Sequence, residues 1–74
     1  MRAERIVCSE VAGVVWKIEA KVGETLSAQD PIMILESMKM EIPVPAPIDG
    51  IITKILVEEG EIIGEGHELA VMGT

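Results

Sequence analysis

The residues best suited to chemistry lie together in the middle of the chain, at positions 36–41, with the sequence Glu-Ser-Met-Lys-Met-Glu. Lys39 stands between Met38 and Met40 at the expected tip of a turn, where glycine, asparagine, aspartate or serine is usual. Methionines exposed at a turn do not contribute to the apolar core. Their soft and adaptable side chains suit a surface that contacts another molecule. If the three residues alternate, both methionines share one face and Lys39 points the other way. A protruding lysine in this setting is a candidate for covalent modification.

Other catalytic arrangements are missing from the sequence. Ser37 lies in no Gly-x-Ser-x-Gly elbow and has no positioned histidine, so a nucleophile role is not predicted. The glycine-rich run at 60–66 lacks the Lys-Ser/Thr ending of a phosphate loop. The one cysteine, Cys8, cannot form an internal disulfide, and with a single histidine it cannot supply a zinc site. We therefore predict no catalytic residue and no metal site, in a chain that is not itself an enzyme.

Composition narrows the classes of partner. The chain has 6 basic and 13 acidic residues, for a net charge of −7, which argues against nucleic acid and against an anionic membrane surface. No apolar run approaches the roughly 20 residues of a membrane span, and the N-terminal segment lacks the apolar core of a signal peptide. A lone unpaired cysteine suits a reducing compartment. The expected protein is cytoplasmic and a monomer in isolation.

Two stretches alternate between apolar and other residues, as half-buried strands do. In residues 14–22, the alternating apolar set that includes Trp16 is expected to face the core or its edge. Residues 40–46 alternate as well, and three prolines fall at a single parity: Pro43, Pro45 and Pro47. Alternate residues of a strand point their N–H groups to the same side, so the missing donors all lie along one side. Only an edge strand tolerates this loss, and the prolines would also protect that edge.

The sequence also repeats itself at a spacing of 37 residues. Gly13 and Gly50 begin the two copies, which share five identical positions and the same apolar parity without a gap. Two copies of a strand-turn-strand unit, each with one apolar face, are expected to bury those faces against each other. The prediction is one all-β domain over residues 1–74, a flattened barrel or sandwich of two antiparallel sheets with pseudo-twofold symmetry. The hairpin that holds Lys39 would protrude at the end away from both termini.

Residues 36–40, Glu-Ser-Met-Lys-Met, resemble the attachment motif of the biotinyl/lipoyl attachment domain family. In that family's biotinyl members, the lysine of a Met-Lys-Met triplet at a hairpin tip becomes biotinylated. Residues 46–50, Ala-Pro-Ile-Asp-Gly, are similar to the family segment that opens the second half. The resemblance covers about residues 6–72, and the distance of 35 residues from Lys39 to the C-terminus also fits the family.

Two comparisons with the family pattern concern the first half. The family often opens this half with Ala-Pro-Met-x-Gly, whereas this chain has Ser-Glu-Val-Ala-Gly at 9–13. Some members also carry an inserted thumb, but Gly13 and Gly23 are 10 residues apart, as are Gly50 and Gly60, so no insertion fits. The chain therefore resembles the thumbless biotinyl domain of biotin carboxyl carrier proteins, present alone as in the stand-alone biotin/lipoyl attachment proteins.

The resemblance implies the hammerhead fold and a carrier function. Biotin protein ligase would join biotin to Lys39 as an amide, and would recognise Met38, Met40 and Glu36. The biotin arm would then carry activated carboxylate between a biotin carboxylase site and a carboxyltransferase site. Covalent biotin is thus the expected cofactor.

Lipoate is the chief alternative, because lipoyl domains resemble this fold and also place a lysine at the hairpin. Their lysine usually follows aspartate and precedes alanine, so Met38 and Met40 favour biotin, whereas Glu36 occurs in both groups. A dual biotin and lipoate acceptor and an unmodified adaptor of the same fold stay open as well, although an adaptor has no need of the Met-Lys-Met triplet. Which carboxylase and which acceptor substrate the chain would serve does not follow from the sequence.

Overall fold

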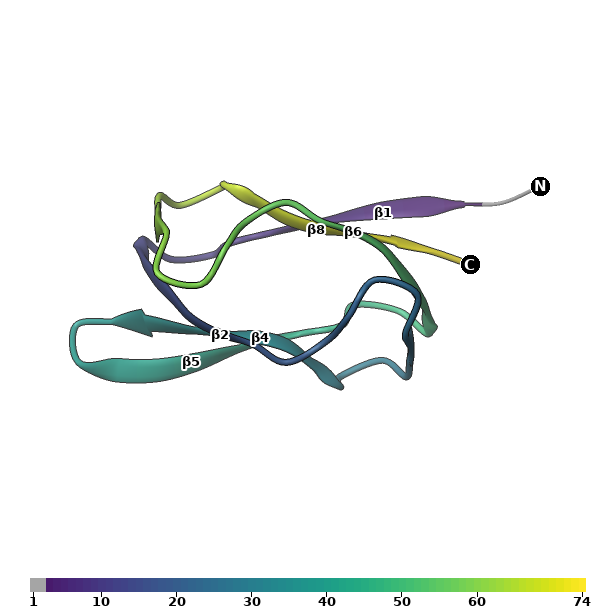
Figure 1. Ribbon diagram of the computed structural model, residues 1–74, viewed down its shortest axis with the longest axis horizontal. Helices are drawn as coiled ribbons and strands as arrows, with labels where there is room; N and C mark the ends of the chain where they lie inside the picture. Colours follow the sequence, from purple (N-terminus) through teal and green to yellow (C-terminus); the bar gives the residue numbers. More distant parts are fainter. Residues whose placement is uncertain (1–2) are drawn as a thin grey trace.

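The computed structural model describes residues 3–74, so the first two residues of the predicted domain lie outside it. Every regular element in this described part is a β-strand, and Figure 1 shows the strands stacked as two layers. In chain order the strands are β1 Glu4–Cys8, β2 Gly13–Ile18, β3 Thr25–Leu26, β4 Pro31–Ser37, β5 Met40–Pro45, β6 Gly50–Ile55, β7 Ile62–Ile63 and β8 Glu68–Gly73. The predicted all-β class is confirmed.

These strands form two antiparallel sheets of four. One sheet has the order β1-β8-β6-β3, and the other has the order β5-β4-β2-β7. The long dimension of the molecule, 39 Å, runs from the two termini to the turn between β4 and β5 (Figure 1). The predicted pair of sheets is confirmed, and so is the hairpin that protrudes away from both termini.

The repeat in the sequence is also a repeat in the structure. A shift of 37 residues carries β2, β3 and β4 onto β6, β7 and β8. Backbone hydrogen bonds follow the same shift, because Gly23 N donates to the Ile52 carbonyl and Gly60 N donates to the Val15 carbonyl, both at 2.7 Å. Each half also gives its two-residue strand to the sheet of the other half, since β3 pairs with β6 and β7 pairs with β2. The halves therefore interlock, with the expected pseudo-twofold symmetry.

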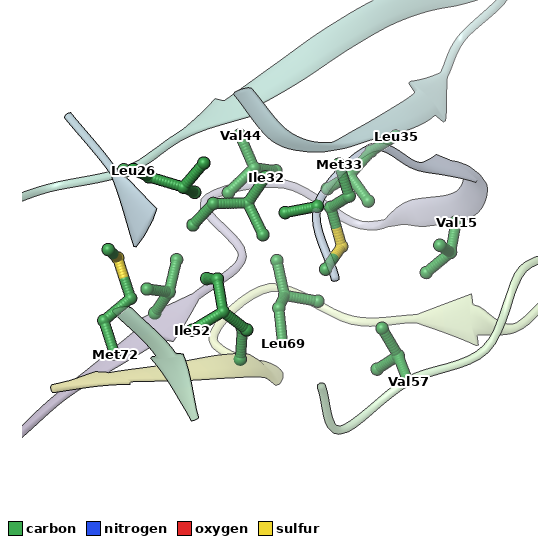
Figure 2. Close-up of a cluster of buried hydrophobic side chains, with 14 of the residues drawn as sticks. Val15, Leu26, Ile32, Met33, Leu35, Val44, Ile52, Val57, Leu69 and Met72 are labelled. Atoms are coloured by element: carbon green, nitrogen blue, oxygen red, sulfur yellow. The ribbon is translucent and has the colours of Figure 1, made fainter. Parts of the chain in front are cut away.

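The core lies between the sheets and is built from aliphatic side chains and methionine. Figure 2 shows Ile32 and Val44 of one sheet pointing toward Ile52 and Leu69 of the other. The largest fully buried side chains are Ile32, Met33, Leu35, Ile52, Leu69, Met72 and Val15. Cys8 is a free thiol, so the burial of these apolar side chains is the main source of stability.

One sequence prediction about the core is wrong. Residues 14–22 do not form a single alternating strand, because β2 ends at Ile18 and its register with β4 shifts between Val15 and Lys17. Such a bulge inserts one extra residue and reverses the alternation beyond it. Val15 is therefore fully buried, whereas Trp16, which was expected at the core or its edge, is 49% exposed. The register of β6 with β8 shifts in the same way, between Ile52 and Lys54.

The proline-containing strand β5 lies at the edge of its sheet, as predicted. Ala46 both donates and accepts a backbone hydrogen bond at 2.8 Å with the loop before β4, so Pro43 and Pro45 face the free edge. β1 is the related edge of the other sheet, and 37 residues separate Ile6 from Pro43. Ala3 accepts a hydrogen bond at 3.0 Å from the backbone N–H that follows β8. The N–H of Ile6 therefore points outward, in the position that proline occupies in β5.

Candidate modification site

The turn between β4 and β5 holds only Met38 and Lys39, because Ser37 and Met40 form the last cross-strand pair. Both turn residues have positive φ, 52° for Met38 and 65° for Lys39. This is the backbone of a type I′ hairpin turn, which ordinarily uses Asn-Gly. The left-handed conformation costs a non-glycine residue about 1–2 kcal/mol. The predicted turn is confirmed, but the predicted alternation through it is wrong, because two positive φ angles in succession reverse the chain.

Side chains at this turn are open to solvent. Met38 is 92% exposed and Met40 is 64% exposed, and Lys39 is exposed as well. Within residues 3–74, no carboxylate forms an ion pair with Lys39. The Lys39 amine is therefore accessible and has no ion-pair partner in this part of the chain, and a soft apolar side chain lies on either side of it.

Two carboxylates lie at the neck of the hairpin. Glu36 of β4 is opposite Glu41 of β5 in the register, and both are exposed. Like charges directly opposite each other are destabilising, and in the described part of the chain neither carboxylate has an ion-pair partner. Glu36, which the sequence assigned to recognition by a ligase, is therefore available to a basic group of another protein.

The base of the hairpin is fixed to the rest of the fold. Ser37 Oγ donates a hydrogen bond to the Ala12 carbonyl at 2.8 Å. Gly13 lies against β4, where a Cβ atom would collide with the carbonyl of Glu36. Sequence reasoning missed this role of Ser37, because the partner is 25 residues away and no local pattern marks it. For Gly13, the 37-residue repeat is the only feature of the sequence that marks the position as structurally important. The hairpin thus has a rigid base and an exposed tip.

Elsewhere, residues 3–74 offer little chemistry. They contain no group of three or more histidine, cysteine, aspartate or glutamate side chains placed to hold a metal ion. A groove of about 280 Å³ lies between β1 and β5, but aliphatic and proline side chains form most of its lining. His67 Nε2 lies 3.8 Å from Glu61 Oε2 in an exposed pair. The described part also has no helix that is long and apolar enough to cross a membrane. The hairpin lysine is therefore the leading candidate site.

Comparison with known proteins places the chain in a family. Residues 1–72 match the biotin/lipoyl family model, which is described as a biotin-requiring enzyme. A biotin/lipoyl attachment protein of Bacillus subtilis is 40% identical over 63 residues, which cover 85% of this chain and 86% of the relative. The chain belongs to the biotin/lipoyl attachment family, as its motif indicated. Within that family it is a carrier domain, like the relatives that are named as attachment and carrier proteins.

Longer relatives include both biotin and lipoyl proteins. A biotin carboxyl carrier protein of Streptococcus mutans is 39% identical over 57 residues, which cover 77% of this chain and 44% of that protein. A dihydrolipoyllysine-residue acetyltransferase component of the pyruvate dehydrogenase complex of Cupriavidus necator is 33% identical over 56 residues, 76% of this chain and 10% of that protein. The crystal structure of the Kluyveromyces lactis urea carboxylase matches with a TM-score of 0.90 and 36% identity, over 95% of this chain and 6% of that one. The chain thus spans between 6% and 44% of these longer proteins, and it shares the fold of the urea carboxylase over the matched part.

Proposed function

We propose that Lys39 is the attachment site of covalent biotin and that residues 1–74 form a single biotin carboxyl carrier domain. The main support is the turn itself, in which an exposed lysine and an exposed methionine both hold positive φ. Strain of this kind persists only where the surrounding structure imposes it, and it is concentrated at functional sites. The Met-Lys-Met triplet at that turn is the part of the chain that resembles the biotinyl attachment motif.

The hairpin suits a lysine that has to enter other proteins. Its turn lies at the far end of the long axis from both termini (Figure 1), so a partner can reach the tip without meeting the chain ends. The hydrogen bond from Ser37 to Ala12 ties the base of the hairpin to the segment that precedes β2. An acylated lysine arm would extend on the order of 10 Å or more.

Acylation requires the neutral Lys39 amine, because an ammonium has no free electron pair. In residues 3–74 no carboxylate pairs with this group, so the ligase would supply the base that takes its proton. The amine would attack the carboxyl carbon of biotin adenylate, form an amide bond and displace the nucleotide. One positive charge is lost in this step, which would change the net charge of the chain from −7 to −8.

Biotin held on Lys39 would supply a carrier for a carboxyl group between a biotin carboxylase site and a carboxyltransferase site. The chain contributes the tether, which raises the effective concentration of the cofactor at both sites. The proposed partners are therefore biotin protein ligase, biotin carboxylase and carboxyltransferase, in the cytoplasm. A net charge of −7 gives no basis for nucleic acid or an anionic membrane as a further partner.

Lipoate on the same lysine is the second candidate, and the chain as an acceptor of either group is a variant of it. The support is the lipoyl relative from Cupriavidus necator, which matches 76% of the chain. Met38 and Met40 favour biotin, because lipoyl domains usually place aspartate and alanine beside the lysine. Glu36 is compatible with both cofactors.

Labelling in vitro tests the proposal. The chain is incubated with biotin protein ligase, biotin and ATP, and in parallel with a lipoate ligase, lipoate and ATP. We expect biotin on the unaltered chain and none on Lys39→Arg, with the same circular dichroism for both because Lys39 is exposed. Biotin on another lysine of the Lys39→Arg chain would contradict the site. Labelling by lipoate alone would assign the chain to acyl transfer, and labelling by neither would favour an unmodified adaptor.

A further inference from the structure

The sheet that carries the hairpin has an apolar patch on its outer face. This patch, called the Trp16 patch below, consists of Val14, Trp16, Ile34 and Ile62. Val14 is paired with Ile62 of β7, and Lys17 is paired with Ile34 of β4, so three neighbouring strands contribute to it. Trp16 is 49% exposed and Ile62 is 81% exposed, and none of the four residues belongs to the buried core or packs against it.

The pseudo-twofold symmetry shows that the fold does not need two of these apolar side chains. At a shift of 37 residues, Trp16 corresponds to Thr53 and Ile62 corresponds to Thr25. Thr53 donates a hydrogen bond to the Val71 carbonyl at 3.1 Å, so a hydroxyl is accommodated next to the bulge. The outer face of the hairpin sheet is therefore apolar at two positions where the other sheet carries threonine. Exposed apolar side chains without a folding role mark interaction surfaces.

This patch is continuous with the hairpin. Val14 pairs with Glu36, and Glu36 pairs with Glu41, so the patch leads across the sheet to the two carboxylates at the hairpin neck. The next residue, Ser37, is hydrogen bonded to Ala12, which holds the hairpin against the strand that bears Trp16. A partner seated on the patch would thus meet the turn in a fixed orientation. The carboxylates predict that the partner has an apolar seat with basic groups beside it.

An enzyme that modifies only Lys39 must distinguish it from the other lysines, and this requirement indicates which partner uses the Trp16 patch. The chain has four lysines, and Lys17, Lys21 and Lys54 are exposed like Lys39. An enzyme that acylates Lys39 alone needs contacts beyond the amine, and Lys17 lies within the patch, opposite Ile34. We propose that the Trp16 patch is the docking surface for biotin protein ligase, whose seat covers Lys17 and directs Lys39 into the active site. This inference rests on the proposed function of Lys39.

Steady-state biotinylation tests the docking surface with matched variants. The Trp16→Thr/Ile62→Thr chain carries the residues that the other half uses at the same positions. The control chain, Ile51→Thr/Leu56→Thr, changes two side chains of the second half that are 44% and 42% exposed. Circular dichroism first establishes that both fold. We expect KM to rise about tenfold or more for the first chain with kcat unchanged, since aromatic anchors carry much of the affinity of an interface. The control should stay within about twofold.

A second measurement observes the contact directly. Trp16 is the only tryptophan of the chain, so 5-fluorotryptophan places a single ¹⁹F label in the patch. We expect the ¹⁹F resonance of the labelled Lys39→Arg chain to shift or broaden when ligase is added. An unchanged KM, an equal loss in both variant chains, or an unmoved ¹⁹F resonance would overturn the docking surface while leaving biotinylation of Lys39 intact. If the unaltered chain accepts no biotin, the proposed function fails, and the docking surface fails with it.

Discussion

Replacing Met38 with asparagine should make the domain more stable and a poorer ligase substrate. Met38 has a φ of 52° at the first position of the hairpin turn. A left-handed backbone costs a residue such as methionine about 1–2 kcal/mol, and asparagine tolerates it because its side chain bonds locally. Met38 is 92% exposed, so its replacement removes almost no packing. We expect Met38→Asn to raise the free energy of unfolding by about 0.5–1 kcal/mol.

For a domain of 74 residues, this gain in the free energy of unfolding is large enough to measure by thermal unfolding. Unfolding entropy near 60 °C is about 2.1 cal/mol/K per residue, so 0.5–1 kcal/mol corresponds to about 3–6 °C in Tm. Thermal unfolding followed by far-UV circular dichroism gives the shift, and biotinylation of the same samples gives kcat/KM. The matched control is Met40→Asn. It changes a second exposed methionine, two residues away, that does not have positive φ.

For Met38→Asn, we expect Tm and kcat/KM to change in opposite directions. The Tm rises because backbone strain is relieved, while kcat/KM falls because the ligase loses an apolar contact beside Lys39. Met40→Asn should lower kcat/KM without raising Tm, since asparagine is disfavoured in a strand. A Tm for Met38→Asn that is unchanged or lower, or an equal rise in the control, would refute the argument that the turn is strained.

Two further predictions concern the backbone. Gly50→Ala should lower the free energy of unfolding by about 1–3 kcal/mol in chemical denaturation, because the added Cβ would collide with the carbonyl of Gly73. Gly64→Ala should change it little, because the space around that Cβ is open. Equal effects of the two would contradict the close approach of β6 to β8. Ile6→Pro should cost less than about 1 kcal/mol, because its N–H points to the free edge. Arg5→Pro removes a ladder donor and leaves a carbonyl of β8 unpaired, so it should cost about 1–3 kcal/mol. The reverse order of these two Tm values would mean that the register of β1 is wrong.

Several features could be predicted from the sequence because a local pattern encodes them. Prolines of a single parity identified an edge strand, since a missing N–H is tolerated only where no neighbour needs it. The 37-residue repeat identified the pseudo-twofold sandwich, since two amphipathic units of one design bury the same face. The turn at Lys39 was expected just before the alternating strand at 40–46. In each case the pattern can be read without knowing which strands pair.

Other features depend on partners that are distant in sequence. The bulge at Val15 and Lys17 arises from the pairing of β2 with β4, and it exposes Trp16 although the alternation alone would bury it. Ser37 looks like a turn residue, but its hydroxyl bonds a carbonyl 25 positions earlier. Positive φ at Met38 is imposed by the closing strand pair and not by the residue, because methionine does not favour it.

The most direct test of the central claim is the intact mass of the protein from its own host, with peptide mapping around Lys39. We expect an added mass of one biotin less one water, confined to the peptide that contains Lys39. The same addition on a peptide with Lys17, Lys21 or Lys54 would contradict the site. An addition of lipoate less one water would contradict the cofactor, and an unmodified chain that biotin protein ligase also refuses in vitro would contradict the carrier function itself.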